Sequence, residues 1–176
     1  MKIENLKLDG LAKLNIVLLL IMFLLSCQPK SSQKINPEQY QKNLINANKI
    51  MVANDDDDIN NYITRHQWQM KQSGSGLRYL IYESGNGAIL EKGNIVKINY
   101  EVELINGTKV DNGIKEFEVG HGGVESGIEE AMLLLKVGDK AKLILPPHLA
   151  FGLLGDENKI PSHATLIYNI KILSVK

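Results

Sequence analysis

The chain has 176 residues, of which 44% are hydrophobic and 23% are charged, and both fractions are typical of a globular protein. Its 20 basic and 20 acidic residues cancel, so the composition gives no electrostatic footprint for nucleic acid, and no nucleic-acid partner is predicted. The length suffices for one domain with extensions.

The first 26 residues are predicted to be an export signal and not part of the fold. Lys2, Lys7 and Lys13 precede an uninterrupted apolar run over residues 16–25. A membrane-spanning helix needs about 20 apolar residues, so this shorter run indicates a secretory signal peptide. The segment ends at Cys27, which is the single cysteine of the chain and so has no intramolecular disulfide partner.

The ending Leu24-Leu25-Ser26-Cys27 resembles the lipobox of bacterial lipoproteins. The resemblance implies that Cys27 is lipidated, becomes the mature amino terminus and anchors the protein to a membrane. Gln28 and the absence of a nearby acidic run favour, by the same resemblance, a periplasm-facing lipoprotein. The alternative is an ordinary secreted protein with a free thiol.

Residues 27–76 are predicted to form a lipidated tether and a helical arm. Asn36-Pro37-Glu38 is a helix-start signal, with an N-cap residue, a proline in the first turn and an acid beside it. The acidic run 55–58 predicts the start of a second helix that continues to Met70. Residues 73–76, Ser-Gly-Ser-Gly, are expected to close the arm as a hinge.

Two short amphipathic helices cannot form a core of their own. Their apolar stripes should therefore pack on the domain, on each other or on a second copy, and residues 37–70 are a candidate homo-oligomer contact. The acidic run lacks the glycine turn and ligand spacing of a calcium loop, and His66 lacks a second ligand four residues on. We therefore predict no metal site and no cofactor.

Residues 77–176 are predicted to form one domain with antiparallel strands and a single helix. The strand over residues 95–104 alternates apolar and polar side chains, as a half-buried strand does. Asn106-Gly107 follows it and predicts a hairpin turn with positive φ at both positions. The other predicted elements are strands at 77–83, 108–111, 116–119, 140–145 and 166–172, and a helix at 124–136 that ends before a Gly138 cap.

This pattern predicts an α+β domain in which five or six antiparallel strands wrap over one short helix around a single core. The apolar stripe of the helix, which includes Ile128 and Met132, should meet the inward residues of the sheet.

The order of the segments resembles the FKBP-type peptidyl-prolyl cis-trans isomerases. The matching blocks are GLRYLIYESGNG, VKINYEVELINGTKVD, VESGIEEAMLLLKVGDKAKLILPPHLAFG and IPSHATLIYNIKIL. With the lipobox and the arm, which joins the domain through ITRHQWQMKQSGSG, the chain is also similar to the FKBP-type lipoproteins associated with gliding motility. The resemblance implies an FKBP-like fold with a proline-binding pocket between the helix and the concave face of the sheet.

The resemblance also assigns the site, residue by residue. It implies that Glu125 acts through its backbone N–H on a substrate carbonyl and that Asp111 is the single polar wall. The residues matched to catalytic positions are Tyr100, Asp111, Phe151 and Tyr168, and those matched to substrate-binding positions are Val110, Val124, Glu125, Ile128 and Ile160.

Several of these positions depart from the family pattern by losing aromatic surface. Ile128 stands where Trp is usual, Val110 where Phe is usual, and Phe151 replaces a Tyr. Lys115 stands where an aromatic residue is common, and the segment 111–117 is shorter than in the family. Each large aromatic side chain buries about 150–250 Å², so these changes should weaken the binding of proline.

We therefore predict a membrane-anchored peptidyl-prolyl isomerase that acts on proline-containing polypeptides and assists the folding of exported proteins, including those of a gliding machinery. Rotation about an X–Pro bond needs no nucleophile, metal or cofactor, because no bond is made or broken. The alternative is a chaperone or assembly-factor binding module with weak or no turnover. A third hypothesis is a structural component of a surface-motility apparatus.

Overall fold

The structure is a computed structural model that describes residues 36–176. Residues 44–176 form one compact unit. The predicted signal peptide, Cys27 and the tether lie outside the described residues. Within residues 36–176, no helix combines the length and the apolar character that a membrane span requires.

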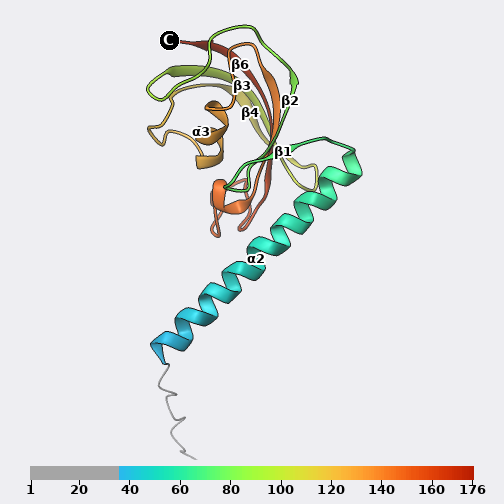
Figure 1. The fold of residues 1–176 in the computed structure, drawn as a ribbon, viewed down its shortest axis with the longest axis vertical. Coiled ribbons are helices and arrows are strands. Elements are labelled where there is room, and N and C mark those ends of the chain that lie inside the picture. The colour runs from blue at the N-terminus through green and yellow to red at the C-terminus, as the bar shows by residue number, and fades with distance from the viewer. Residues whose placement is uncertain (1–35) are drawn as a thin grey trace, which may run out of the picture. The chain divides into compact units, whose positions relative to one another are not determined.

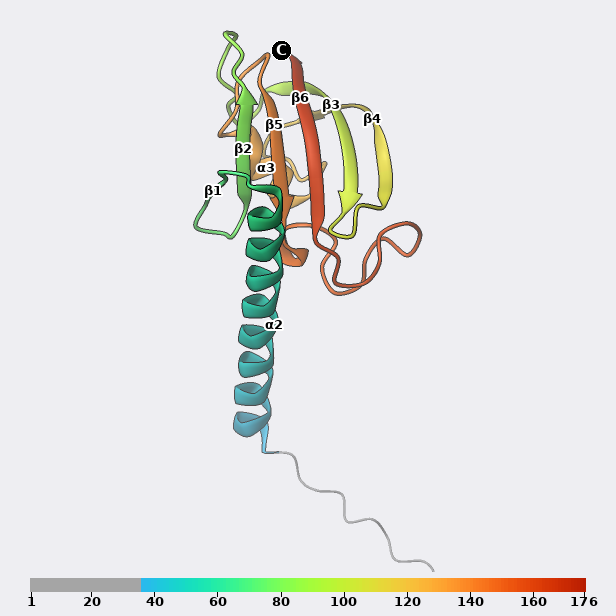
Figure 2. The same cartoon turned by 90° about the vertical axis from the view of Figure 1, so that its right-hand side faces the viewer.

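This unit contains a six-stranded antiparallel sheet in the order β1-β2-β5-β6-β3-β4 (Figure 1, Figure 2). The α+β prediction of five or six strands around one short helix is thereby confirmed. The elements are α2 (Pro37–His66), β1 (Lys71–Gln72), β2 (Arg78–Glu83), β3 (Ile95–Leu104), β4 (Lys109–Glu118), α3 (Ser126–Met132), β5 (Lys140–Leu145), the 3-10 helix η1 (Pro147–Leu149) and β6 (Leu166–Val175).

The main core lies between α3 and the concave face of the sheet (Figure 1). The predicted stripe of the helix is confirmed, because Ile128, Ala131, Met132 and Leu135 are all at most 2% exposed. The helix itself is shorter than predicted and ends at Met132. Its following residues continue in tighter turns, in which the N–H of Leu135 donates to the Met132 carbonyl over 3.2 Å.

Gly138 was expected to cap this helix, and the structure corrects that prediction. It has a φ of 93° and lies in the turn before β5, against Gly85. The buried carboxylate of Asp139 closes this turn by accepting the N–H of Gly85 at 2.7 Å and the N–H of Lys136 at 2.9 Å.

The β3–β4 hairpin forms as predicted, but its turn has a different conformation. Only Gly107, with a φ of 86°, has a positive φ, while Asn106 does not. The N–H of Gly107 donates to the Leu104 carbonyl, and the Asn106 side chain accepts the N–H of Thr108. This is a turn with one left-handed glycine and a bulge, which the register shift after Val102 also marks.

The strands expected at 108–111 and 116–119 are a single strand, β4. Its register with β3 runs unbroken from Val102 opposite Asp111 to Ile95 opposite Glu118. Residues 112–115, which separate the two predicted strands, continue the ladder, so their backbone donors and acceptors are paired with β3.

The arm is also continuous, which corrects the prediction of two helices. α2 is one helix of 30 residues that passes through the acidic run. Two of its carboxylates are bound by side chains of the domain: Asp55 contacts His163 at 2.8 Å and Asp56 contacts Arg78 at 2.9 Å. The run therefore does not need a helix terminus to stabilise its charge, and it is not the solvated helix start that we expected.

The second half of α2 packs on the outer face of the sheet, on the side opposite α3 (Figure 2). Ile59 and Tyr62 are 0% and 6% exposed, and they contact Ile144 of β5 and Ile167 of β6. Of the three partners considered for the arm, this half therefore packs on the domain.

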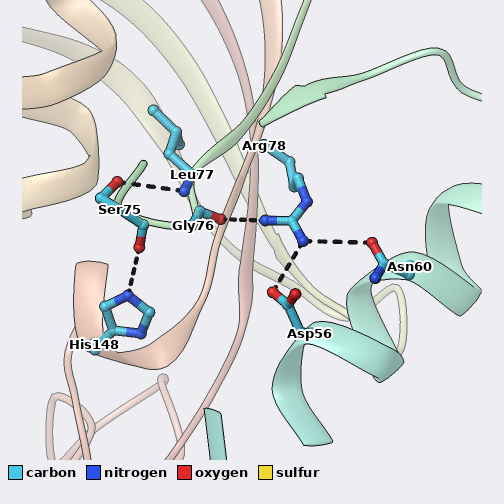
Figure 3. A network of polar contacts seen from close by, with 7 residues as sticks. All are labelled: Asp56, Asn60, Ser75, Gly76, Leu77, Arg78 and His148. Atoms are coloured by element: carbon cyan, nitrogen blue, oxygen red, sulfur yellow. Dashed lines mark hydrogen bonds and ion pairs between the residues drawn. The ribbon is translucent and has the colours of Figure 1, made fainter. Parts of the chain in front are cut away.

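The expected hinge at residues 73–76 is a fixed hairpin turn between β1 and β2. The N–H of Ser73 donates to the Leu77 carbonyl at 2.9 Å. Arg78, which is 3% exposed, donates to the Gly76 carbonyl and to Asp56, and His148 donates to the Ser75 carbonyl (Figure 3). Partly buried contacts of Arg78 thus connect the turn with the arm, and an exposed contact of His148 connects it with η1.

Candidate functional site

Two adjoining cavities lie between α3, the concave face of the sheet and the loop 150–165. They have volumes of about 40 Å³ and about 200 Å³ and share the residues Asp111, Glu125 and Tyr168. All nine residues predicted for the site line one cavity or both. The smaller cavity is lined by Ile98, Tyr100, Asp111, Lys115, Val124, Glu125, Ile128 and Tyr168, and the larger by Val102, Val110, Asp111, Glu125, Phe151, Asp156, Asn158, Lys159, Ile160 and Tyr168.

One wall of the smaller cavity is made by the β3–β4 hairpin. The ladder places Tyr100 opposite Gly113 and Val102 opposite Asp111, so Tyr100 and Asp111 are diagonal neighbours. The Tyr100 hydroxyl donates to Oδ2 of Asp111 at 2.8 Å. Partial burial, this hydrogen bond and the Asp111 charge raise the pKa of Tyr100. At neutral pH the phenol therefore stays protonated and donates its hydrogen bond to Asp111.

The neighbouring strand β6 and the residue before α3 contribute a second phenol–carboxylate pair. The Tyr168 hydroxyl of β6 donates to Oε1 of Glu125 at 2.9 Å. Burial of Tyr168, followed by the charge of Glu125, raises the pKa of the phenol far above its ordinary value. The Tyr100 and Tyr168 rings lie with their centroids 6.4 Å apart, so the two pairs stand side by side.

Glu125 immediately precedes α3, with the extended angles φ −57° and ψ 143°. Within the described residues its backbone N–H donates no hydrogen bond, which leaves it available for the role that the sequence resemblance implies. Its side chain was not predicted to take part. The available signal was the tyrosine at 168, because a buried phenol hydroxyl needs a partner.

The floor and the rim of the smaller cavity lack the aromatic side chains that are usual in the family. Ile128 is 1% exposed and forms the floor. Lys115 pairs with Ile98 on β3 and so occupies an inward position of β4, where its side chain lines the smaller cavity. The sequence reasoning missed Ile98 and Val102 as lining residues, although both share the strand parity of Tyr100.

The loop 150–165 supplies Phe151 and Ile160 to the larger cavity. Asp156 shapes this loop, because its Oδ1 accepts the N–H of Ile160 at 2.6 Å and of Asn158 at 2.9 Å. The hydrogen bond from Ile160 is the main reason that the pKa of Asp156 is lowered. Gly155 cannot be replaced easily, since a Cβ there would lie 2.2 Å from the Ile160 carbonyl oxygen.

The glycine-rich loop 120–123 and His66, which lie away from the two cavities, make hydrogen bonds within the fold. The glycine-rich loop 120–123 places the N–H groups of Gly120 and Gly122 on the Glu129 carboxylate, at 2.6 and 2.9 Å. His66 stacks on Tyr62 and its Nδ1 lies 2.9 Å from the Tyr62 carbonyl oxygen. In the described part of the chain, no three His, Cys, Asp or Glu side chains are grouped so that they could hold a metal ion.

The arrangement suits binding of a small apolar ring beside a peptide group. Aliphatic and aromatic side chains line its interior, and the two phenol–carboxylate pairs with one free N–H provide polar contacts at its edge. Sites of this composition bind ligands by shape and orient them through a few polar groups.

Comparisons with known proteins agree with this geometry. The sequence profile described as FKBP-type peptidyl-prolyl cis-trans isomerase matches residues 87–173. FK506-binding protein 2 of Dictyostelium discoideum is 36% identical over 90 residues, which cover 48% of this chain and 68% of that protein. The crystal structure of AtFKBP13 aligns with a TM-score of 0.59 at 27% identity and covers 62% of this chain and 100% of that chain.

Bacterial relatives match over a similar segment. The FKBP-type peptidyl-prolyl cis-trans isomerase FkpA of Escherichia coli strain K12 is 36% identical over 110 residues, which cover 61% of this chain and 40% of FkpA. The chain thus spans less than half of the length of this relative. The chain belongs to the family of FKBP-type peptidyl-prolyl cis-trans isomerases.

Proposed function

We propose that this protein catalyses cis-trans isomerisation of X–Pro bonds in polypeptides. The observation that carries the proposal is the pair of cavities at the position where the family resemblance implies a proline pocket, with all nine matched residues around them. The uncatalysed barrier of about 18–20 kcal/mol arises from amide resonance. A site therefore accelerates the reaction if it binds the twisted imide more tightly than the planar one.

The apolar and the polar residues of the site would have different roles in this reaction. Val124, Ile128 and Phe151 would surround the proline ring and exclude water, which favours the less polar twisted imide. The Glu125 N–H would hold a neighbouring carbonyl, so that only the imide turns. Tyr100 keeps Asp111 in place through its 2.8 Å hydrogen bond, and the carboxylate would orient the substrate backbone.

We further propose that the protein works as a periplasm-facing lipoprotein, anchored through Cys27, on exported polypeptides that include components of a gliding machinery. The support is the sequence alone: a short apolar signal, a lipobox-like ending and a single cysteine. Labelling with a radioactive fatty acid, in wild type and in Cys27→Ala, tests the anchor. Equal labelling of the two proteins would refute it.

A homo-oligomer through the arm is proposed only for its first half. Ile59 and Tyr62 are buried against the sheet, whereas Tyr40 and Leu44, which lie four residues apart on one face of the helix, are 52% and 51% exposed. An apolar stripe of this kind can be covered by a second copy. Sedimentation of wild type and Leu44→Glu would show a change in mass if the stripe is the contact.

The binding-module alternative is favoured by one observation: charged side chains line both cavities, among them Lys115, Asp156 and Lys159. Such a rim could hold unfolded chains without efficient turnover. The test that separates the two functions compares Asp111→Leu and Phe151→Ala with wild type in exchange NMR of a Leu-Pro peptide and in suppression of aggregation. Loss of isomerisation in both variants supports the enzyme, while unchanged isomerisation in both contradicts the assigned site.

A further inference from the structure

The acidic run of α2 contacts the loop that carries part of the candidate site. Asp55 of the arm and His163 of the loop are 108 residues apart in the sequence, and Oδ1 of Asp55 lies 2.8 Å from Nε2 of His163. The Asp55 side chain is 13% exposed and that of His163 is 35% exposed, so the contact is largely shielded from water. A carboxylate can only accept, so Nε2 carries the proton of this hydrogen bond.

His163 lies at the base of the loop. Its backbone N–H donates to the carbonyl of Gly152 at 3.1 Å, which joins the two ends of the loop. Gly152 directly follows Phe151, and His163 lies three residues after Ile160, so this closure determines where both cavity-lining side chains stand.

The conformation of His163 has to be stabilised by its surroundings. Its φ is 57°, a left-handed value that is uncommon for non-glycine residues and that the surrounding contacts have to support. Nδ1 of its ring is buried and has no partner among the described residues. The bond to Asp55 is therefore the side-chain hydrogen bond that holds the ring, and its loss would leave the imidazole without one.

From these contacts we propose that Asp55 is a positioning residue for the isomerase site: through His163 it holds the loop 150–165, and so Phe151 and Ile160, in the arrangement that receives the substrate. The arm is then part of the functional unit and not a spacer. The inference rests on the proposed function for its catalytic consequence, but the effect on the loop can be measured independently of catalysis.

The neighbouring acids provide matched variants. Asp57 carries the same charge two residues along the helix, is exposed, and makes no ion pair within the described residues. Asp55→Ala and Asp57→Ala therefore remove the same charge from the same helix, while only the first breaks the contact with His163. Asp55→Asn retains an acceptor oxygen and serves as the conservative rescue variant.

A structural probe distinguishes local from global effects. Trp68 is the single tryptophan of the chain and packs in the cluster between the arm and the sheet. Its fluorescence therefore reports whether α2 remains docked. Hydrogen exchange of the amides of residues 150–165 reports the order of the loop itself.

The experiment is carried out on the lipid-free chain from residue 31 to residue 176, with Leu-Pro peptide as substrate. For Asp55→Ala we expect unchanged Trp68 emission, faster exchange of the loop amides, and a KM raised about fivefold with little change in kcat, the size expected for one lost hydrogen bond. Asp55→Asn should restore most of the affinity, and Asp57→Ala should match wild type.

Loop exchange and KM in Asp55→Ala equal to those of Asp57→Ala would overturn the proposal. Equal acceleration of exchange throughout the domain would also overturn it, because that result indicates general destabilisation. If wild type shows no isomerisation, the proposed function fails, and the loop exchange of the same four proteins still decides whether Asp55 positions the loop.

Discussion

Replacement of Lys115 by Phe should increase the activity of the site. Lys115 occupies an inward position of β4, opposite Ile98, and its side chain lines the cavity whose floor is Ile128. A charged, strongly hydrated ammonium group at this rim gives a proline ring little apolar surface to cover. Phe would supply a flat apolar wall facing the Tyr100 and Tyr168 side of the cavity.

The size of the gain follows from the surface that a substrate can cover. If a bound proline and its neighbour cover about 60 Å² of the new ring, at about 25 cal/mol per Å² the gain in binding free energy is ~1.5 kcal/mol. That corresponds to an increase of about tenfold in kcat/KM if the contact is kept in the transition state. A contact made equally in the ground state and the transition state would lower KM and leave kcat unchanged, whereas one confined to the ground state would lower both and leave kcat/KM unchanged.

The assay is kcat/KM for a Leu-Pro peptide, measured by exchange NMR for wild type and Lys115→Phe. Lys97→Phe is the matched control, because Lys97 is on the same sheet but at an exposed, outward position opposite Glu116. Unchanged or lower activity in Lys115→Phe, with the fold intact by circular dichroism, would show that this cavity does not receive the substrate.

Two further predictions concern stability. Burial raises the pKa of both Tyr100 and Tyr168 in the folded state. The stability that the two phenols contribute is therefore complete below the ordinary tyrosine pKa of about 10. It is lost as the pH rises from that value toward the raised pKa values of the folded protein. Urea unfolding between pH 8 and pH 11 should show this loss, and Tyr168→Phe should reduce it; an identical decline in the variant would contradict the role of Tyr168. Ile59→Ala should lower the free energy of unfolding by about 2–5 kcal/mol, because it leaves a cavity under α2. Ile50→Ala, at a position that is 62% exposed, should change the free energy of unfolding little. Similar losses in the two variants would refute the packing of the arm.

The domain fold could be predicted because local signals agreed with the tertiary packing. The alternation from Val96 to Leu104 and the helical stripe around Ile128 each describe one buried face, and the two faces meet in the core. The site followed from the family resemblance, since nothing in the periodicity distinguishes a cavity-lining residue such as Val124 from a core residue. The roles of these residues stay predictions.

The arm was less predictable because its stability depends on distant partners. Four successive aspartates look like a helix terminus until Arg78 and His163, which bind two of them, are known to lie nearby. A signal for the docking of the arm was present in the strands. Ile144 and Ile167 interrupt the polar face of β5 and β6 with apolar residues, which indicates that both faces of the sheet are covered there.

The central claim is that the folded domain turns over X–Pro bonds. It is tested most directly by the exchange rate between the cis and trans resonances of a Leu-Pro peptide, with and without the lipid-free chain at high concentration. We expect an exchange rate, measured from the cross-peaks, that rises in proportion to protein concentration. The uncatalysed background exchange has a time constant of tens to hundreds of seconds. A rate that stays at this background, in a sample whose Trp68 emission and amide spectrum show the folded protein, would contradict the account.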